Sequence, residues 1–205
     1  MVDNVFGMSA IPDWNLHGVI PPFEPIDPTG AVRSPYIVSL TDVVLRFAVT
    51  PERVEIMAGF LRYRQLLHTV GIVSGFQWLD GSFLEDVEMI RTAPPKDIDV
   101  TTFFHLPVGK TEGELVKELA KDYPILLDKV VIKQQYHTDG FLVGLDPNNL
   151  EFCMQQSHYW YGVWSHQRDT FRWKGFVQID LDPQVDTPAD VVLQNQRVAL
   201  GGTAK

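Results

Sequence analysis

The sequence predicts an α/β (α+β) fold in which helices flank a mixed β-sheet, with an extended arm at the N-terminus. Segments with apolar residues at helical spacing alternate along the chain with short apolar runs that are typical of buried strands. Helices and strands therefore intermingle instead of forming two separate groups, which favours a mixed sheet covered by helices. The 205 residues, 45% hydrophobic and 21% charged, are enough for one well-buried domain of ordinary globular composition.

The N-terminal part of the chain lacks a regular pattern. Residues 1–35 are rich in proline, glycine and aspartate, so we expect an irregular arm. The segment Ile11-Pro12-Asp13-Trp14 carries apolar side chains that would pin this arm to the body. We expect the folded domain to span residues 36–182 and a C-terminal tail, with a short helix near 190–197, to span residues 183–205.

The clearest helix begins at Thr50-Pro51, where an N-cap threonine precedes a first-turn proline, and it ends at Gly71. Its apolar positions recur at helical spacing: Val54, Met57, Phe60, Leu61, Tyr63, Leu66, Leu67 and Val70. The elements expected after it are a buried strand at 72–79, a short helix at 83–90, a loop at 92–96, a strand at 98–106 and a charged helix at 112–121.

The second half of the chain is expected to add more strands. The β-branched run Val130-Val131-Ile132 favours a third β region over residues 127–144. An aromatic-rich helix is expected over 148–164, in which Trp160 and Trp164 form either core or a partner surface. A strand pair or one extended strand is expected over 168–181.

Two aspartates alternate on the strand predicted at 98–106. Because residues i and i+2 of a strand share a face, Asp97 and Asp99 should lie side by side while Ile98 and Val100 enter the core. Neighbouring carboxylates repel each other unless a cation lies between them, and oxygen ligands suit Mg²⁺ or Mn²⁺. The turn Gly81-Ser82 can offer backbone N–H groups and a hydroxyl to phosphates. Together these residues predict a metal-dependent nucleotide site.

These motifs resemble the signature of the DNA polymerase β-like nucleotidyltransferase superfamily, which is a Gly-Ser turn followed by an Asp-x-Asp pair on the next strand. The chain is most similar to small prokaryotic and phage-associated nucleotidyltransferase-like proteins. Shared features are Ile11-Pro12-Asp13, Gly81-Ser82-Phe83, Tyr136-His137-Thr138-Asp139, Arg168-Asp169 and Lys174-Gly175. Superfamily members include modifying toxins and defence enzymes. The loop between the turn and the Asp pair, with Pro94-Pro95, is at the long end for the superfamily.

The resemblance implies a Mg²⁺- or Mn²⁺-dependent transfer of a nucleoside monophosphate from an NTP to an RNA, protein or small-molecule acceptor. Asp97 and Asp99 would hold the metal ions and Asp139 would complete the set, although Asp128 and Asp146 are rivals for that third place. Gly81 and Ser82 would grip the triphosphate. The alternative function is that of a nucleotidyltransferase-like nucleotide sensor, antitoxin or interaction module without turnover.

A basic segment follows the aromatic-rich helix. On a strand, Arg168, Arg172 and Lys174 would share one face and contact the nucleotide or RNA, or they would form an ordinary solvated face. The net charge of −9 restricts nucleic-acid contact to a local basic patch of this kind.

The remaining sequence properties bear on location and partners. The lone Cys153 and the absence of a signal-peptide pattern favour a cytoplasmic protein, and no apolar run is long enough for a membrane span. A homodimer or a cognate protein partner is left open by the aromatic helix. No P-loop, dinucleotide-binding glycine motif, zinc-ligand spacing or nucleophile elbow is present in the sequence.

Overall fold

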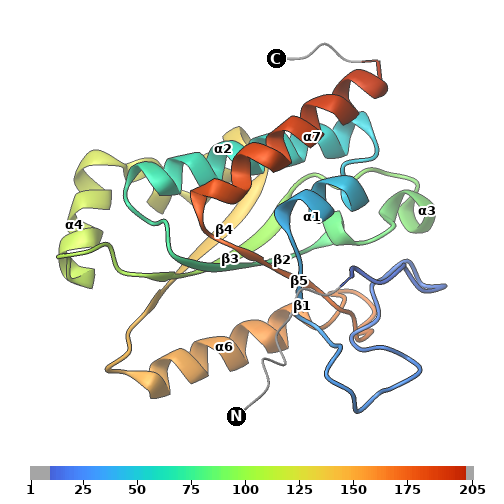
Figure 1. Ribbon diagram of the computed structural model, residues 1–205, viewed down its shortest axis with the longest axis horizontal. Coiled ribbons are helices and arrows are strands. Elements are labelled where there is room, and N and C mark those ends of the chain that lie inside the picture. The colour runs from blue at the N-terminus through green and yellow to red at the C-terminus, as the bar shows by residue number, and fades with distance from the viewer. Residues whose placement is uncertain (1–9, 202–205) are drawn as a thin grey trace.

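A five-stranded mixed sheet organises the computed structural model, which describes residues 10–201 (Figure 1). The strands are β1 (Tyr36–Ile37), β2 (Gly75–Asp80), β3 (Ile98–His105), β4 (Thr138–Leu145) and β5 (Val177–Asp180). Their order in the sheet is β1-β5-β2-β3-β4, with β1 parallel to β5, β3 parallel to β4, and β2 antiparallel to both of its neighbours. The predicted α/β (α+β) class is therefore confirmed.

Helices cover both faces of this sheet. They are α1 (Leu40–Phe47), α2 (Pro51–Thr69), α3 (Val87–Arg91), α4 (Glu112–Asp122), α5 (Lys129–Tyr136), α6 (Leu150–Trp164) and α7 (Asp186–Ala199), with 3₁₀ turns η1 (Ser82–Leu84), η2 (Pro124–Leu127) and η3 (Pro183–Val185). Figure 1 shows α1, α2 and α7 together on one face and α6 on the other. None of the helices between residues 10 and 201 combines the length and apolar character needed to cross a bilayer.

The central helix α2 forms as its sequence predicts. The Thr50 side chain accepts a hydrogen bond from the Arg53 N–H, and Pro51 occupies the first turn. Of the eight apolar positions predicted for its buried face, all are buried except Leu66, which is partly buried. Ile98 and Val100 of β3 are likewise fully buried, as expected from the strand alternation.

The N-terminal arm is attached to the body where its apolar residues predict. Ile11 and Trp14 pack against the core. The indole Nε1 of Trp14 donates a 2.7 Å hydrogen bond to the Leu84 carbonyl, and its ring centroid lies 6.1 Å from that of Phe47. This contact fixes the arm beside the segment that follows β2. Residues 1–9, which begin the predicted arm, lie outside the described residues.

The β region predicted over residues 127–144 is wrong in its first half. Residues 129–136 form helix α5, and only β4 is a strand. The reason is local, because the Asp128 carboxylate accepts hydrogen bonds from the N–H groups of Val130 and Val131 and caps the helix. Of the β-branched run only Ile132 is buried, and Tyr136 at the end of the helix packs against the core as well.

Two more predictions change in detail. The strand expected over 168–181 is limited to β5, and the short helix expected over 190–197 is the longer α7, which packs on α1 and α2.

Trp160 and Trp164 of α6 are core residues, with ring centroids 4.4 and 6.1 Å from that of Phe141. They therefore form no exposed partner surface.

Candidate active site

Three aspartates form a row across neighbouring strands at one end of the sheet. Asp80, the last residue of β2, lies directly opposite Asp99 of β3, and Asp99 lies opposite Asp139 of β4. Because directly paired residues project from the same face of a sheet, the three carboxylates face one way. Asp97 precedes β3 by one residue and alternates with Asp99, so the predicted pair joins this row.

The predicted glycine turn packs directly against the row of carboxylates. Gly81 has φ +84°, in the left-handed region that favours glycine, and a Cβ atom there would lie 2.3 Å from Oδ2 of Asp99. The buried guanidinium of Arg53 supports the turn by donating 2.6 Å hydrogen bonds to the carbonyls of Phe83 and Glu85. Only a glycine therefore allows the backbone to approach the carboxylate so closely.

A cavity of about 550 Å³ opens over this end of the sheet. Its walls include six of the eight predicted site residues: Gly81, Ser82, Asp97, Asp99, Arg168 and Lys174. The other walls come mainly from Lys133 of α5 and from the end of α6 with the loop that follows it. The structure thus brings together the predicted turn, the Asp pair and one of the two predicted arginines, Arg168, around a single space.

Asp139 and Arg172 lie outside the cavity lining. Asp139 stands next to it in β4, opposite Asp99, whereas its two rivals have other roles. Asp128 caps α5, and Asp146 accepts a 2.8 Å hydrogen bond from the Asn148 N–H in the turn after β4. Of the three candidates for the third carboxylate, only Asp139 belongs to the row.

The basic strand predicted over residues 168–174 does not form. Between α6 and β5 the backbone folds back on itself, since Gln167 N–H bonds the Arg172 carbonyl and Phe171 N–H bonds the Gln167 carbonyl, each at 2.9 Å. This segment is a closed loop and not an extended strand, so the three basic residues do not share a face. Arg168 and Arg172 are exposed, whereas Lys174 is buried.

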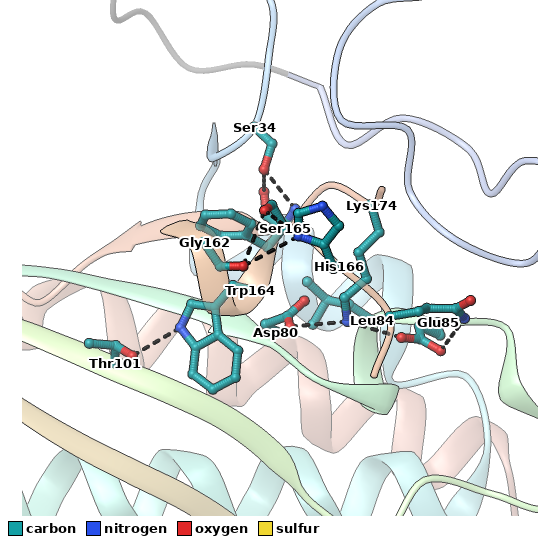
Figure 2. A network of polar contacts seen from close by, with 12 residues as sticks. Ser34, Asp80, Leu84, Glu85, Thr101, Gly162, Trp164, Ser165, His166 and Lys174 are labelled. Carbon is teal, nitrogen blue, oxygen red and sulfur yellow. Dashed lines mark hydrogen bonds and ion pairs between the residues drawn. The ribbon is translucent and has the colours of Figure 1, made fainter. Parts of the chain in front are cut away.

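Lys174 is the centre of a buried ionic network. Its Nζ lies 3.0 Å from Oδ2 of Asp80 and 2.9 Å from Oε1 of Glu85, and Figure 2 shows the ammonium between the two carboxylates. The amide of Gln167 donates a 2.9 Å hydrogen bond to the other oxygen of Glu85. Burial lowers the pKa of Lys174, but the two carboxylates outweigh it and the net pKa is raised. The ammonium therefore ties the loop after α6 to the end of β2.

The carboxylate row carries an electrostatic cost. Burial, opposed by Lys174, raises the pKa of Asp80 to about 6. Burial and the neighbouring Asp80, Asp97 and Asp139 raise the pKa of Asp99 to about 7. In addition, Oδ1 of Asp80 is buried without a hydrogen-bond partner. Buried polar atoms are normally satisfied, so this oxygen still lacks one hydrogen-bond donor.

Lys133 supplies the nearest positive charge at the open side of the row. Its Nζ lies 2.8 Å from Oδ2 of Asp97 and 3.3 Å from Oδ2 of Asp139. Although partial burial opposes it, these contacts raise the pKa of Lys133. Within residues 10–201, no three His, Cys, Asp or Glu side chains are arranged as a ready-made metal site.

Sequence reasoning missed three residues of this site. Asp80 adjoins the predicted glycine turn, and a carboxylate ending an apolar strand is a visible signal. Glu85 and Lys133 carry no such signal, because each is placed by partners far away in the sequence or by a helix that was predicted as a strand. Their roles become apparent only from their contacts with Lys174, Asp97 and Asp139.

The comparisons with known proteins give a family but no named relative. No curated protein and no solved structure matches the chain. One family model matches residues 12–180, which include the arm after residue 11, all five strands and the whole cavity lining. The chain therefore belongs to a family of unknown function (DUF6932).

Proposed function

We propose that this protein is a Mg²⁺- or Mn²⁺-dependent nucleotidyltransferase that moves a nucleoside monophosphate from an NTP to an RNA, protein or small-molecule acceptor. The observation that carries the proposal is that Asp97, Asp99 and the Gly81-Ser82 turn line one cavity. The turn has a glycine directly against Asp99, where a positive φ and the close carboxylate would strain any other residue. This juxtaposition of carboxylates and a close backbone turn suits a metal-bound polyphosphate.

The donor set fits magnesium. Mg²⁺ is usually held by one or two carboxylates together with substrate phosphates and water, so Asp97 and Asp99 suffice without a closed protein cage. Asp80 lies in the same row, where its Oδ2 pairs with Lys174 and its Oδ1 has no hydrogen-bond partner. When bound, divalent cations neutralise the phosphates and stabilise the leaving pyrophosphate.

The other residues of the site have roles in binding the triphosphate and in proton transfer that follow from their positions. The Gly81-Ser82 turn binds the triphosphate, and Arg168 at the exposed wall adds positive charge. An acceptor hydroxyl attacks the α-phosphorus, the new P–O bond forms as the bond to the β-phosphate bridging oxygen breaks, and pyrophosphate leaves. Asp139, on the outer strand of the row, accepts the proton of that hydroxyl. Charge neutralisation and positioning supply most of the rate.

Lys133 favours a second candidate, a nucleotide-binding protein without turnover. Its ammonium bridges Asp97 and Asp139 and supplies the positive charge that a metal ion would otherwise bring. If this contact persists with nucleotide present, the protein would bind an NTP as a sensor or interaction module. Replacing Lys133 by Met separates the two candidates. If the metal ion displaces Lys133 in the wild type, the variant should bind Mn²⁺ more tightly and should still transfer the nucleotide.

A labelling experiment tests the proposed activity. Purified protein is incubated with Mg²⁺ or Mn²⁺, each of the four α-³²P-labelled NTPs, and total RNA or protein as acceptors. We expect label transfer by the wild type and none by Asp97→Asn with Asp99→Asn, which keeps the shape of both side chains. Asp190→Asn, at an exposed position on α7, is the matched control. Equal labelling by wild type and double variant would exclude these carboxylates as the catalytic pair.

A further inference from the structure

Phe171 is an exposed aromatic residue in an unfavourable backbone conformation at the wall of the cavity. The residue is 80% exposed, and its φ of +54° lies in the left-handed region that bulky residues avoid. It nevertheless lines the same cavity as Asp97 and Asp99. Strained residues of this kind persist only where the surroundings enforce them, and they cluster at ligand sites.

The surroundings that enforce this conformation lie in the buried network. Phe171 N–H bonds the Gln167 carbonyl at 2.9 Å, and the Thr170 hydroxyl bonds the Gln167 side-chain oxygen at 2.6 Å. Gln167 is itself buried, and its amide group is bonded to Glu85. Because Glu85 also binds Lys174, the loop that presents Phe171 is fixed to the strand end that carries Asp80.

The other aromatic rings near this loop already have partners. Trp164 is buried and donates a 3.0 Å hydrogen bond to the Thr101 hydroxyl (Figure 2). Trp173 packs edge-on against Phe23, with centroids 5.5 Å apart. Within residues 10–201, no aromatic ring or cation is stacked on the ring of Phe171. Its face is therefore free to receive a planar ligand.

We propose that Phe171 stacks on the nucleobase of the NTP whose phosphates bind at the Gly81 turn and the Asp97 and Asp99 carboxylates. This inference rests on the proposed function and adds the base-binding wall to it. The cavity volume of about 550 Å³ lies within the range of small-molecule sites. An aromatic face accepts any base, because every base has a π-face, so the contact gives affinity with little base selectivity.

Binding measurements separate the base contact from the phosphate contact. Titration calorimetry with Mg²⁺ compares ATP with inorganic tripolyphosphate, which lacks the base and the ribose. We expect Phe171→Ala and Phe171→Leu to weaken ATP binding about tenfold, and tripolyphosphate binding to stay within about twofold of wild type. Phe171→Tyr should restore ATP affinity. Tyr159→Ala removes an exposed aromatic ring on α6 outside the cavity lining and should leave both affinities unchanged.

The possible outcomes distinguish this inference from the proposed function. If wild type binds tripolyphosphate and Phe171→Ala binds ATP as tightly as wild type, the stacking inference is overturned while the phosphate site stands. An equal loss for ATP and tripolyphosphate would also overturn it, because the loop would then act only by shaping the phosphate site. If wild type binds neither compound with Mg²⁺, the proposed function fails and the base-binding wall fails with it.

Discussion

Replacing Asp99 by Asn should stabilise the folded protein at neutral and alkaline pH while it abolishes nucleotidyl transfer. Asp99 stands in the middle of the carboxylate row, between Asp80 and Asp139, and Asp97 also lies near it. An asparagine has nearly the same shape but no charge. It therefore removes both the cost of burying the Asp99 charge and the repulsion between Asp99 and its neighbours, without leaving a cavity.

The magnitude follows from the pKa of Asp99. Burial and the neighbouring carboxylates raise it from 3.8 to about 7, which corresponds to about 4 kcal/mol against the ionised form at pH 8. Asn recovers most of this but must bury an amide, so we expect the free energy of unfolding to rise by about 2–4 kcal/mol. For a chain of this length, that gain raises Tm by about 5–15 °C.

The pH dependence gives the sign of the effect. Because the folded-state pKa of Asp99 exceeds the unfolded value, the wild type loses stability as the pH rises from about 4 through about 7. The advantage of Asp99→Asn should therefore be full at pH 8 and small at pH 4. Urea unfolding of both proteins at the two pH values, without divalent ions, measures it. Asp190→Asn, at an exposed site, should change the free energy by less than about 0.5 kcal/mol.

Two results would refute this reasoning. If Asp99→Asn is no more stable than wild type at pH 8, neither burial nor the neighbouring carboxylates penalise the ionised Asp99 in the folded protein. If it is stabilised equally at both pH values, the gain comes from packing or from the unfolded state. A further expectation is that Mg²⁺ raises the Tm of wild type more than that of the variant, since the metal ion and the substitution relieve the same repulsion.

Other substitutions test the surroundings of the row. Lys174→Met leaves Asp80 buried without a counter-charge and leaves Glu85 with only Arg91, 4.0 Å away, so urea unfolding at pH 8 should show a loss of about 3–5 kcal/mol that shrinks at pH 5 as Asp80 takes up a proton. Gly81→Ala places a Cβ 2.3 Å from Oδ2 of Asp99 at φ +84° and should lower both Tm and label transfer. The control is Gly113→Ala in α4, where nothing lies within 4 Å of the added Cβ. It should be neutral or stabilising in the same thermal melt. Phe171→Gly should be about 1 kcal/mol more stable than Phe171→Ala in urea, because both lose the ring but only glycine tolerates φ +54°.

Local signals account for the parts of the fold that sequence reasoning predicted. The start of α2 follows from the Thr50 cap and Pro51, and the burial of Ile98 and Val100 follows from strand alternation. The same kind of signal gave a wrong prediction over residues 129–136, where a β-branched run suggested a strand. There the Asp128 cap, a contact between close neighbours, outweighs a weak side-chain preference.

The sequence by itself therefore determined most of the elements and the motif on which the proposed site rests: a glycine turn at Gly81-Ser82 and two aspartates alternating on a strand. Only the tertiary structure decided that Asp80 and Asp139 stand beside Asp99, because strand register depends on three segments meeting in one sheet. It also decided that Lys174 is buried, through an ion pair with Glu85, 89 positions away. Periodicity and caps act over a few residues, whereas register and buried charge pairs arise only when distant segments pack together.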